Sequence, residues 1–128
     1  MSLKIGSFTS MKKIYICLVF CLLIFGCSTP YKSLTAVMPD LNLVGDGVYR
    51  GIYDLTGTPV KATLDVNIQD NRIISIKIIE HNSSPIGKKA EKIIDKVIEF
   101  QILDVDVVSG ATASSKTILK AVENALQL

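Results

Sequence analysis

The chain has few of the residues that build disulfides, metal sites or nucleophilic catalytic centres. Its 128 residues include three cysteines, one histidine and no tryptophan. The cysteines are Cys17, Cys21 and Cys27, so nothing beyond position 27 can form a disulfide or a thiolate metal site. The single histidine, His81, leaves no Ser/His/Asp or Cys/His set in that part of the chain. A stand-alone enzyme is therefore the least favoured class, and no metal site is expected.

Excess positive charge is also missing once the N-terminal segment is set aside. Without Lys4, Lys12 and Lys13, 11 of the 14 basic residues remain against 12 acidic ones. A balance this close to neutral gives no electrostatic footprint for nucleic acid, and we expect no nucleic-acid partner. The length of 128 residues suits one domain.

A continuous hydrophobic run occupies residues 15–26, near the N-terminus. Lys12 and Lys13 precede this run and small residues follow it, which is typical of an export signal. The run is shorter than the ~20 residues that a membrane-spanning helix needs. We predict a signal peptide over residues 1–26, with a retained signal anchor as the alternative and with either Met1 or Met11 as the start.

The end of this run, Ile24-Phe25-Gly26-Cys27, resembles the lipobox of bacterial lipoproteins. The resemblance implies that Cys27 is acylated and becomes the mature N-terminus. Residues 27–44 contain Pro30 and Pro39 and have no periodicity, so we expect a lipidated N-terminus followed by a flexible tether. The expected location is the cell membrane, with the protein lipid-anchored on the extracytoplasmic face.

Residues 45–128 are expected to form the domain, beginning with three strands. A β-prone run follows the turn at Gly45–Gly47, and hydrophobic residues then alternate with polar ones from Val60 to Gln69. A third strand is expected over Arg72–Glu80, with Ile74, Ile76 and Ile78 on one face.

The register between the last two strands depends on the turn that joins them. A three-residue loop, Asp70-Asn71-Arg72, pairs Ile68 with Ile74 and Leu64 with Ile78, which keeps hydrophobic residues on one face. A two-residue loop at Asp70-Asn71 pairs Ile68 with Ile73 instead. We therefore predict the three-residue loop.

Two helices are expected after the strands. Residues 81–87 are expected to be a loop, residues 88–101 have hydrophobic residues at helical spacing, and a second amphipathic pattern follows near the C-terminus. This order predicts an α+β fold in which a small antiparallel sheet has helices packed on one face. The first helix carries a basic side, for which a solvated surface is favoured over docking to anionic lipid or an acidic partner; its members are Lys88, Lys89, Lys92 and Lys96.

A stretch of small residues from Asp106 to Ser115 leads into the second helix. Gly110 permits a tight turn, and Thr112, Ser114 or Ser115 can cap the helix. A helix N-terminus also stabilises a phosphate through its free N–H groups and partial positive charge. From the spacing alone, a plain helix cap is the favoured interpretation.

The string Asp-x-x-Ser-Gly-Ala-Thr, from Asp106 to Thr112, resembles the flavinylation motif of FMN-binding domain proteins. This family includes the C-subunit domain of the sodium-pumping NADH:quinone oxidoreductase and the G-subunit of the related Rnf complex. The opening segment Gly45–Gly51 and the dipeptide Glu80-His81 also fall in family order, so the resemblance spans residues 45–128. It implies a flavin-bearing loop before the C-terminal helix, with FMN joined to Thr112 by a phosphoester bond. The other expected cofactor-binding residues are Asp106, Ser109, Gly110, Ala111, Ser114, Ser115 and His81.

The function that the resemblance implies is extracytoplasmic electron transfer by covalently held FMN. Expected partners are a flavin transferase for maturation, membrane redox proteins or a quinone-linked complex for electrons, and the lipid membrane through Cys27. Asp106 is expected to accept backbone N–H bonds, to help the transferase bind its metal-bound substrate, or both. The alternative is a non-redox binding or assembly lipoprotein that retains the fold without flavin.

Overall fold

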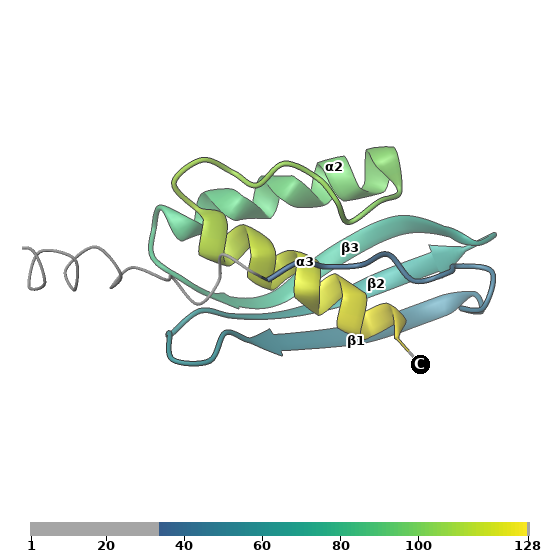
Figure 1. Ribbon diagram of the computed structural model, residues 1–128. Helices are drawn as coiled ribbons and strands as arrows, with labels where there is room; N and C mark the ends of the chain where they lie inside the picture. Colours follow the sequence, from purple (N-terminus) through teal and green to yellow (C-terminus); the bar gives the residue numbers. More distant parts are fainter. Residues whose placement is uncertain (1–33, 128) are drawn as a thin grey trace, which may run out of the picture. The chain divides into compact units, whose positions relative to one another are not determined.

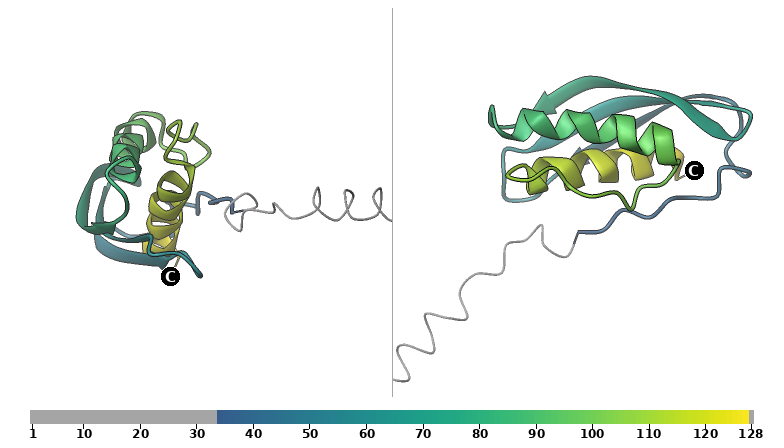
Figure 2. Two further views of the ribbon diagram at one scale, coloured as in Figure 1. Left: turned by 90° about the vertical axis from the view of Figure 1, so that its left-hand side faces the viewer. Right: turned by 90° about the horizontal axis from the view of Figure 1, so that it is seen from above.

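The computed structural model describes residues 34–127, and these form the α+β fold expected from the sequence. The three strands form an antiparallel sheet in the order β1-β2-β3, and the helices cover one of its faces (Figures 1 and 2). The predicted signal peptide, Cys27 and the first part of the predicted tether lie outside the described residues. The elements are β1 (Gly47–Asp54), β2 (Lys61–Gln69), β3 (Arg72–Asn82), the 3₁₀ helix η1 (Gly87–Lys92), α2 (Ile93–Phe100) and α3 (Thr112–Leu126).

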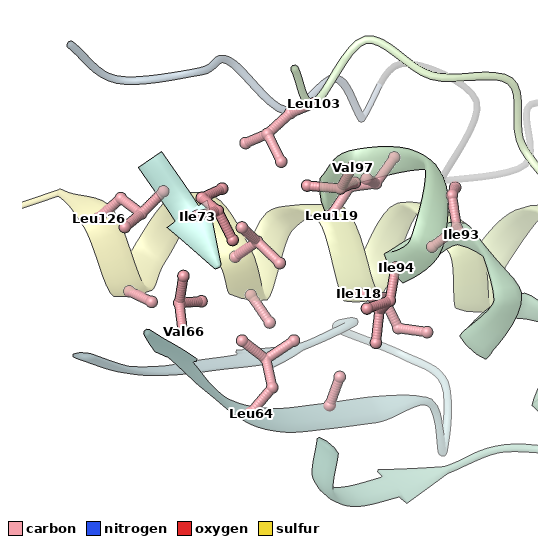
Figure 3. Close-up of a cluster of buried hydrophobic side chains, with 14 of the residues drawn as sticks. Leu64, Val66, Ile73, Ile93, Ile94, Val97, Leu103, Ile118, Leu119 and Leu126 are labelled. Atoms are coloured by element: carbon pink, nitrogen blue, oxygen red, sulfur yellow. The ribbon is translucent and has the colours of Figure 1, made fainter. Parts of the chain in front are cut away.

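The central strand β2 supplies the floor of the hydrophobic core. Its alternating residues are at most 1% exposed, which confirms the predicted period of two; they are Ala62, Leu64, Val66 and Ile68. Helix α3 lies across this face with Ile118 and Val122 fully buried, and α2 adds Ile93 and Val97 (Figure 3). The helical spacing of hydrophobic residues predicted in both helices is thus confirmed as their buried sides.

The predicted three-residue loop between β2 and β3 is wrong. Asp70 and Asn71 alone form the turn, with φ of 51° and 58°, because a two-residue hairpin whose twist matches its strands needs positive φ at both positions. Ile68 therefore pairs with Ile73, which is 2% exposed. The expected burial of Ile74 is also wrong, since this residue is 46% exposed.

The first of two irregularities in the ladder explains why Leu64 nevertheless pairs with Ile78, as predicted. The register shifts between Asn67 and Ile68 and again between Thr63 and Leu64, so β3 carries one extra residue at each place. Ile74 is the extra residue at the first shift, and it points away from the core. The first bulge returns the hydrophobic face of β3 to the inside after a turn that would otherwise have reversed it.

β1 and α3 approach each other closely at Gly51. A Cβ atom at this position would lie 1.9 Å from the carbonyl oxygen of Ala121 and 2.8 Å from the Cβ of Ala125. Only glycine leaves room for the helix backbone at this distance. The contact fixes the height of α3 above the sheet and therefore the position of its N-terminus.

The chain leaves α2 through Gln101, which has a left-handed backbone with φ of 55°. The Gln101 side chain accepts a hydrogen bond from the Ile73 N–H at 2.8 Å and donates one to the Ile73 carbonyl at 2.9 Å. This amide therefore joins the end of α2 to the outer edge of β3. Residues 102–111 then run back along the helices to the start of α3 (Figure 1).

Part of the segment that we assigned to the tether packs on the domain. Residues 34–40 have no regular secondary structure, yet Val44 is 3% exposed and belongs to the core. Ala36, Met38 and Leu41 pack against that core. Within residues 34–127, no helix has the length and hydrophobicity needed to cross a membrane.

Candidate functional site

The C-terminal helix α3 begins at Thr112, the last residue of the Ser-Gly-Ala-Thr string. Thr112 is half-buried, and its hydroxyl has no hydrogen bond within the described residues. Ala111 precedes the helix, and no side chain caps the helix N–H groups. The predicted capping role of Thr112, Ser114 or Ser115 is therefore wrong. The first-turn N–H groups have no acceptor inside the helix and remain free to bind an anion.

Ser115 instead holds the loop that precedes the helix. Its buried hydroxyl accepts a hydrogen bond from the Val108 N–H at 3.1 Å and donates one to the Ala111 carbonyl at 2.8 Å. The Ala111 N–H donates to the Val108 carbonyl at 2.9 Å, which closes a tight turn. Gly110 lies in this turn with φ of +78°, a conformation that favours glycine. The turn that precedes Thr112 is thus held in place by Ser115, which belongs to the same helix as Thr112.

A second turn, residues 83–87, packs against the first turn of α3. A Cβ atom on Gly87 would lie 2.6 Å from the Ser114 hydroxyl oxygen and 2.9 Å from Ser83. The Gly87 N–H donates to the Ser84 hydroxyl at 3.1 Å, which closes this turn. Ile86 is 57% exposed, and its Cγ2 would be 3.7 Å from a Cβ on Gly110. The two glycine turns therefore lie beside each other near Thr112.

Sequence reasoning missed the contact between Gly87 and Ser114. Both residues were visible as small residues near turns, but their pairing depends on how η1 packs on α3. Pro85 and Gly87 did indicate irregular chain here, and the structure has it over residues 83–86, with Gly87 beginning η1. The only feature of the sequence that relates the two positions is that both residues, Gly87 and Ser114, are small enough for a close contact.

His81 lies in β3, so the expected loop over residues 81–87 begins later than predicted. Its side chain is only 1% exposed, and Nδ1 lies 3.0 Å from a Glu91 carboxylate oxygen. The other ring nitrogen, Nε2, is buried and has no hydrogen-bond partner. The imidazole of His81 is therefore enclosed by the protein, and its expected role as a cofactor-binding residue stays a prediction.

The remaining motif residues lie at the surface. Ser109, Gly110 and Asp106 are exposed. Asp106 also lines a groove of about 470 Å³ that runs beside the end of α2. The other residues of this groove are Lys96, Phe100, Ile102, Asp104 and Val105. The described residues contain no cluster of three or more potential metal ligands of the His, Cys, Asp or Glu type.

Comparison with protein families supports the resemblance seen in the sequence. The family model described as FMN-binding domain matches residues 56–127, which is more than half of the chain. The chain belongs to the FMN-binding domain family. The match runs from the β1–β2 turn to the end of α3 and includes the whole Asp106–Thr112 string. Flavin binding is therefore the property that this fold and site share with the family.

A curated relative comes from Treponema pallidum (strain Nichols) and is described only as an uncharacterized protein. It is 37% identical over 84 residues, which cover 64% of this chain. The aligned part is 23% of the relative, so the chain matches less than a quarter of that protein's length.

The residues present at the start of α3 fit FMN. The unpartnered Thr112 hydroxyl lies at the N-terminus of a 15-residue helix, where a phosphate is stabilised. Gly110 and Ala111 beside it have little or no side chain, so the approach to the hydroxyl is open. The two turns around Thr112 are fixed by hydrogen bonds before any ligand is bound.

Proposed function

We propose that this protein carries FMN covalently attached to Thr112 through a phosphoester bond and transfers electrons. The observation that carries the proposal is the Thr112 hydroxyl, which is half-buried and unpartnered at the first residue of α3. A threonine whose hydroxyl is needed for folding would instead be bonded to the helix or the loop. This hydroxyl is held in place by its backbone and remains available for modification.

The helix N-terminus stabilises the negative charge of the phosphodiester that results. A charge at this position contributes typically about 0.3–1 kcal/mol near the surface, and more where solvent is partly excluded. The Ser115 bonds keep the preceding turn closed, so the N–H groups of the first turn point outward from a fixed position. Asp106 lies exposed at the start of the string, where a transferase can reach it during maturation.

FMN supplies reversible one- and two-electron redox chemistry, which no side chain near Thr112 can supply. The protein holds the group and leaves it accessible. A domain of this size has a limited core and cannot enclose a flavin on all sides. The covalent bond retains a group that would otherwise dissociate, and exposure of the ring lets an electron partner approach it.

We also propose that the protein is lipid-anchored through Cys27 on the extracytoplasmic face of the cell membrane. The support is the lipobox-like sequence at residues 24–27 and the export signal before it. A flavin held outside the cytoplasm cannot be replaced from the internal pool, which favours a covalent bond. The partners that follow are a flavin transferase, and a membrane redox protein or quinone-linked complex.

Coexpression of the full chain with a flavin transferase tests the central claim. The protein should give a flavin-fluorescent band that survives denaturing gel electrophoresis, and Thr112→Val should abolish it. Thr56→Val is the matched control, because Thr56 is an exposed threonine in the turn between β1 and β2, outside the motif; this variant should retain the band. A fluorescent Thr112→Val band would overturn the proposal. An unmodified Thr112 in protein from the native host would favour the non-redox binding function.

A further inference from the structure

We infer that one side of η1 and α2 docks onto an anionic lipid surface. This inference rests on the proposed anchoring of the chain to a membrane, but not on the presence of flavin. The docking surface, termed the lysine face, consists of Lys89, Lys92 and Lys96 together with Phe100 and Ile102. All five residues are exposed.

The lysines lie on one side of the helical segment because their spacing changes where the 3₁₀ helix η1 passes into the α-helix α2. Lys89 and Lys92 are three apart in a 3₁₀ helix, which places them above one another. Lys96 and Phe100 then follow at intervals of four in α2, the spacing of neighbours on one side of an α-helix. Lys96 and Phe100 both line the groove beside residues 102–106, which fixes the direction in which this side points.

The acidic residues of the same segment form a row beside the lysines. Glu91 reaches back to His81 in β3, and Asp95 and Glu99 continue from Glu91 at intervals of four. Asp95 and Glu99 each lie three residues after a lysine, Lys92 and Lys96, so the acidic row adjoins the lysine face on its side toward β3. Asp104 and Asp106 also line the groove, so the basic surface ends there.

Hydrophobic side chains lie next to the lysines. Phe100 is 58% exposed and Ile102 is 43% exposed. An aromatic ring and an aliphatic side chain beside cationic residues are the combination by which peripheral segments bind the headgroup region of a bilayer. The lysines attract anionic lipids, while the two hydrophobic side chains enter the boundary between headgroups and acyl chains.

The path of the N-terminal segment favours lipid over a protein as the occupant. Leu34 and Ala36 line a cavity of about 150 Å³ together with Leu103 and Val105, so this segment and the α2–α3 loop lie against each other (Figure 2). Val105 also lines the groove of the lysine face. The chain therefore enters the domain next to that face.

Chain length then limits how far this side of the domain can move from the anchor. Cys27 precedes Leu34 by seven residues, which span at most about 25 Å when fully extended. An acylated Cys27 thus keeps the neighbourhood of Leu34, and the lysine face beside it, close to the bilayer. Because the Debye length is about 10 Å, the lysines are attracted once the lysine face comes within that distance of the bilayer, and the short connection to Cys27 permits this approach.

A tryptophan placed at position 100 tests the docking directly. The chain contains no tryptophan, so Phe100→Trp emission reports on this position alone. The full-length protein, made without flavin transferase, is reconstituted into vesicles of phosphatidylcholine or of equal parts phosphatidylcholine and phosphatidylglycerol. In the anionic vesicles, the emission should shift to shorter wavelength and be quenched by lipids brominated on their acyl chains. Both effects should be lost in phosphatidylcholine alone and at high salt.

Two comparisons make the result specific. Ile52→Trp places a reporter of similar exposure on β1, where Ile52 is 51% exposed and points away from the helices; it should respond to neither vesicle. Lys92→Glu combined with Lys96→Glu should lower the ratio of docked to undocked domain by a factor of about 30 or more, since each lysine near an anionic surface contributes roughly 1 kcal/mol. Lys61→Glu with Lys77→Glu makes the same charge change on the sheet and should retain docking.

The inference is overturned if the emission of the Phe100→Trp protein is the same in both vesicles, or if the two charge-reversed proteins behave alike. Ile102→Trp provides a second reporter if Phe100→Trp fails to fold. The lipid inference is also overturned if substitution of the lysines has no effect on binding to phosphatidylglycerol but weakens binding to an acidic protein, since the lysine face would then be a protein-docking surface. Flotation of the protein with phosphatidylcholine vesicles measures the anchor separately, and the absence of flavin separates this test from that of Thr112.

Discussion

The hydroxyl of Ser115 accepts a hydrogen bond from the backbone N–H of Val108, seven residues earlier, at a distance of 3.1 Å. Ser115 is fully buried, so water cannot replace it as the acceptor. Ser115→Ala should lower the free energy of unfolding by about 1–3 kcal/mol, because the Val108 N–H loses its partner. Urea denaturation measures this loss, and gel fluorescence after coexpression with a transferase should show reduced flavin loading at Thr112.

Ser109→Ala is the control for that substitution, since Ser109 is exposed and its hydroxyl has no hydrogen bond within the described residues. Its unfolding free energy should remain within about 0.5 kcal/mol of the parent protein. Equal losses for Ser109→Ala and Ser115→Ala would contradict the role of Ser115 in holding the turn.

Gly51 should tolerate no side chain. In Gly51→Ala the new Cβ meets the Ala121 carbonyl oxygen at 1.9 Å, and a backbone atom of a packed helix cannot move aside cheaply. We expect a loss of about 3 kcal/mol or more in urea denaturation. In Gly57→Ala nothing lies within 4 Å, and only the positive φ of 78° is unfavourable, so the loss should be about 1–2 kcal/mol. The ranking of the two variants would be reversed if β1 and α3 did not pack as described.

The contact between Gly87 and Ser114 predicts a dependence of one position on the other. Gly87→Ala should destabilise the protein by about 1–3 kcal/mol, because the new Cβ lies too close to the Ser114 hydroxyl. Ser114→Ala removes that hydroxyl, so the double variant should be more stable than the sum of the single effects predicts. A double-mutant cycle by urea denaturation measures this coupling, expected at about 0.5–3 kcal/mol. Strict additivity would show that the two turns do not touch.

Acid should weaken the link between β1 and β2 through Asp65. Hydrogen bonds from Arg50, at 2.7 and 2.9 Å, hold the pKa of the Asp65 carboxyl below its usual value. The stabilisation is therefore complete above the pKa of the unfolded chain, near 3.8, and is lost as the pH falls through the lower pKa of the folded protein. The difference in urea midpoint between the parent and Asp65→Asn should be constant near neutral pH and shrink below about pH 4.

Asp54→Asn serves as the comparison, because the structure shows no hydrogen bond of the Asp54 carboxylate among the described residues. Its difference from the parent protein gives the effect on the urea midpoint of replacing a carboxylate that has no such hydrogen bond. A difference for Asp65→Asn that grew toward low pH would contradict the pairing with Arg50.

The sequence was sufficient where periodicity decides the structure. Alternation in β2 and helical spacing in α3 both correctly predicted which residues are buried, because a pattern of period 2 or 3.6 maps directly onto one face. The turn at Asp70-Asn71 was wrong because the argument assumed an uninterrupted ladder. The bulge at Ile74 adds one residue to β3, and a single extra residue reverses every later side chain.

The candidate site was predictable only in part. The small residues at 109–112 and the helix after them can be recognised in the sequence, and family resemblance assigned the flavin to Thr112. The role of Ser115 was mistaken for a helix cap, since a serine near a helix start has several local partners to choose from. Packing of η1 on α3 determines the Gly87 contact, and no local pattern encodes it.

The side-chain amide of Gln101 completes β3 in a way that matters beyond the folded monomer. It occupies both the N–H and the carbonyl of Ile73 on the open edge of the sheet. An edge with free backbone groups is a template on which a strand from another molecule can add. At Ile73 both backbone groups already form hydrogen bonds with the Gln101 side chain, so a strand from another molecule can pair there only after it displaces Gln101. Loss of this one amide would therefore favour aggregation more than its contribution to stability suggests.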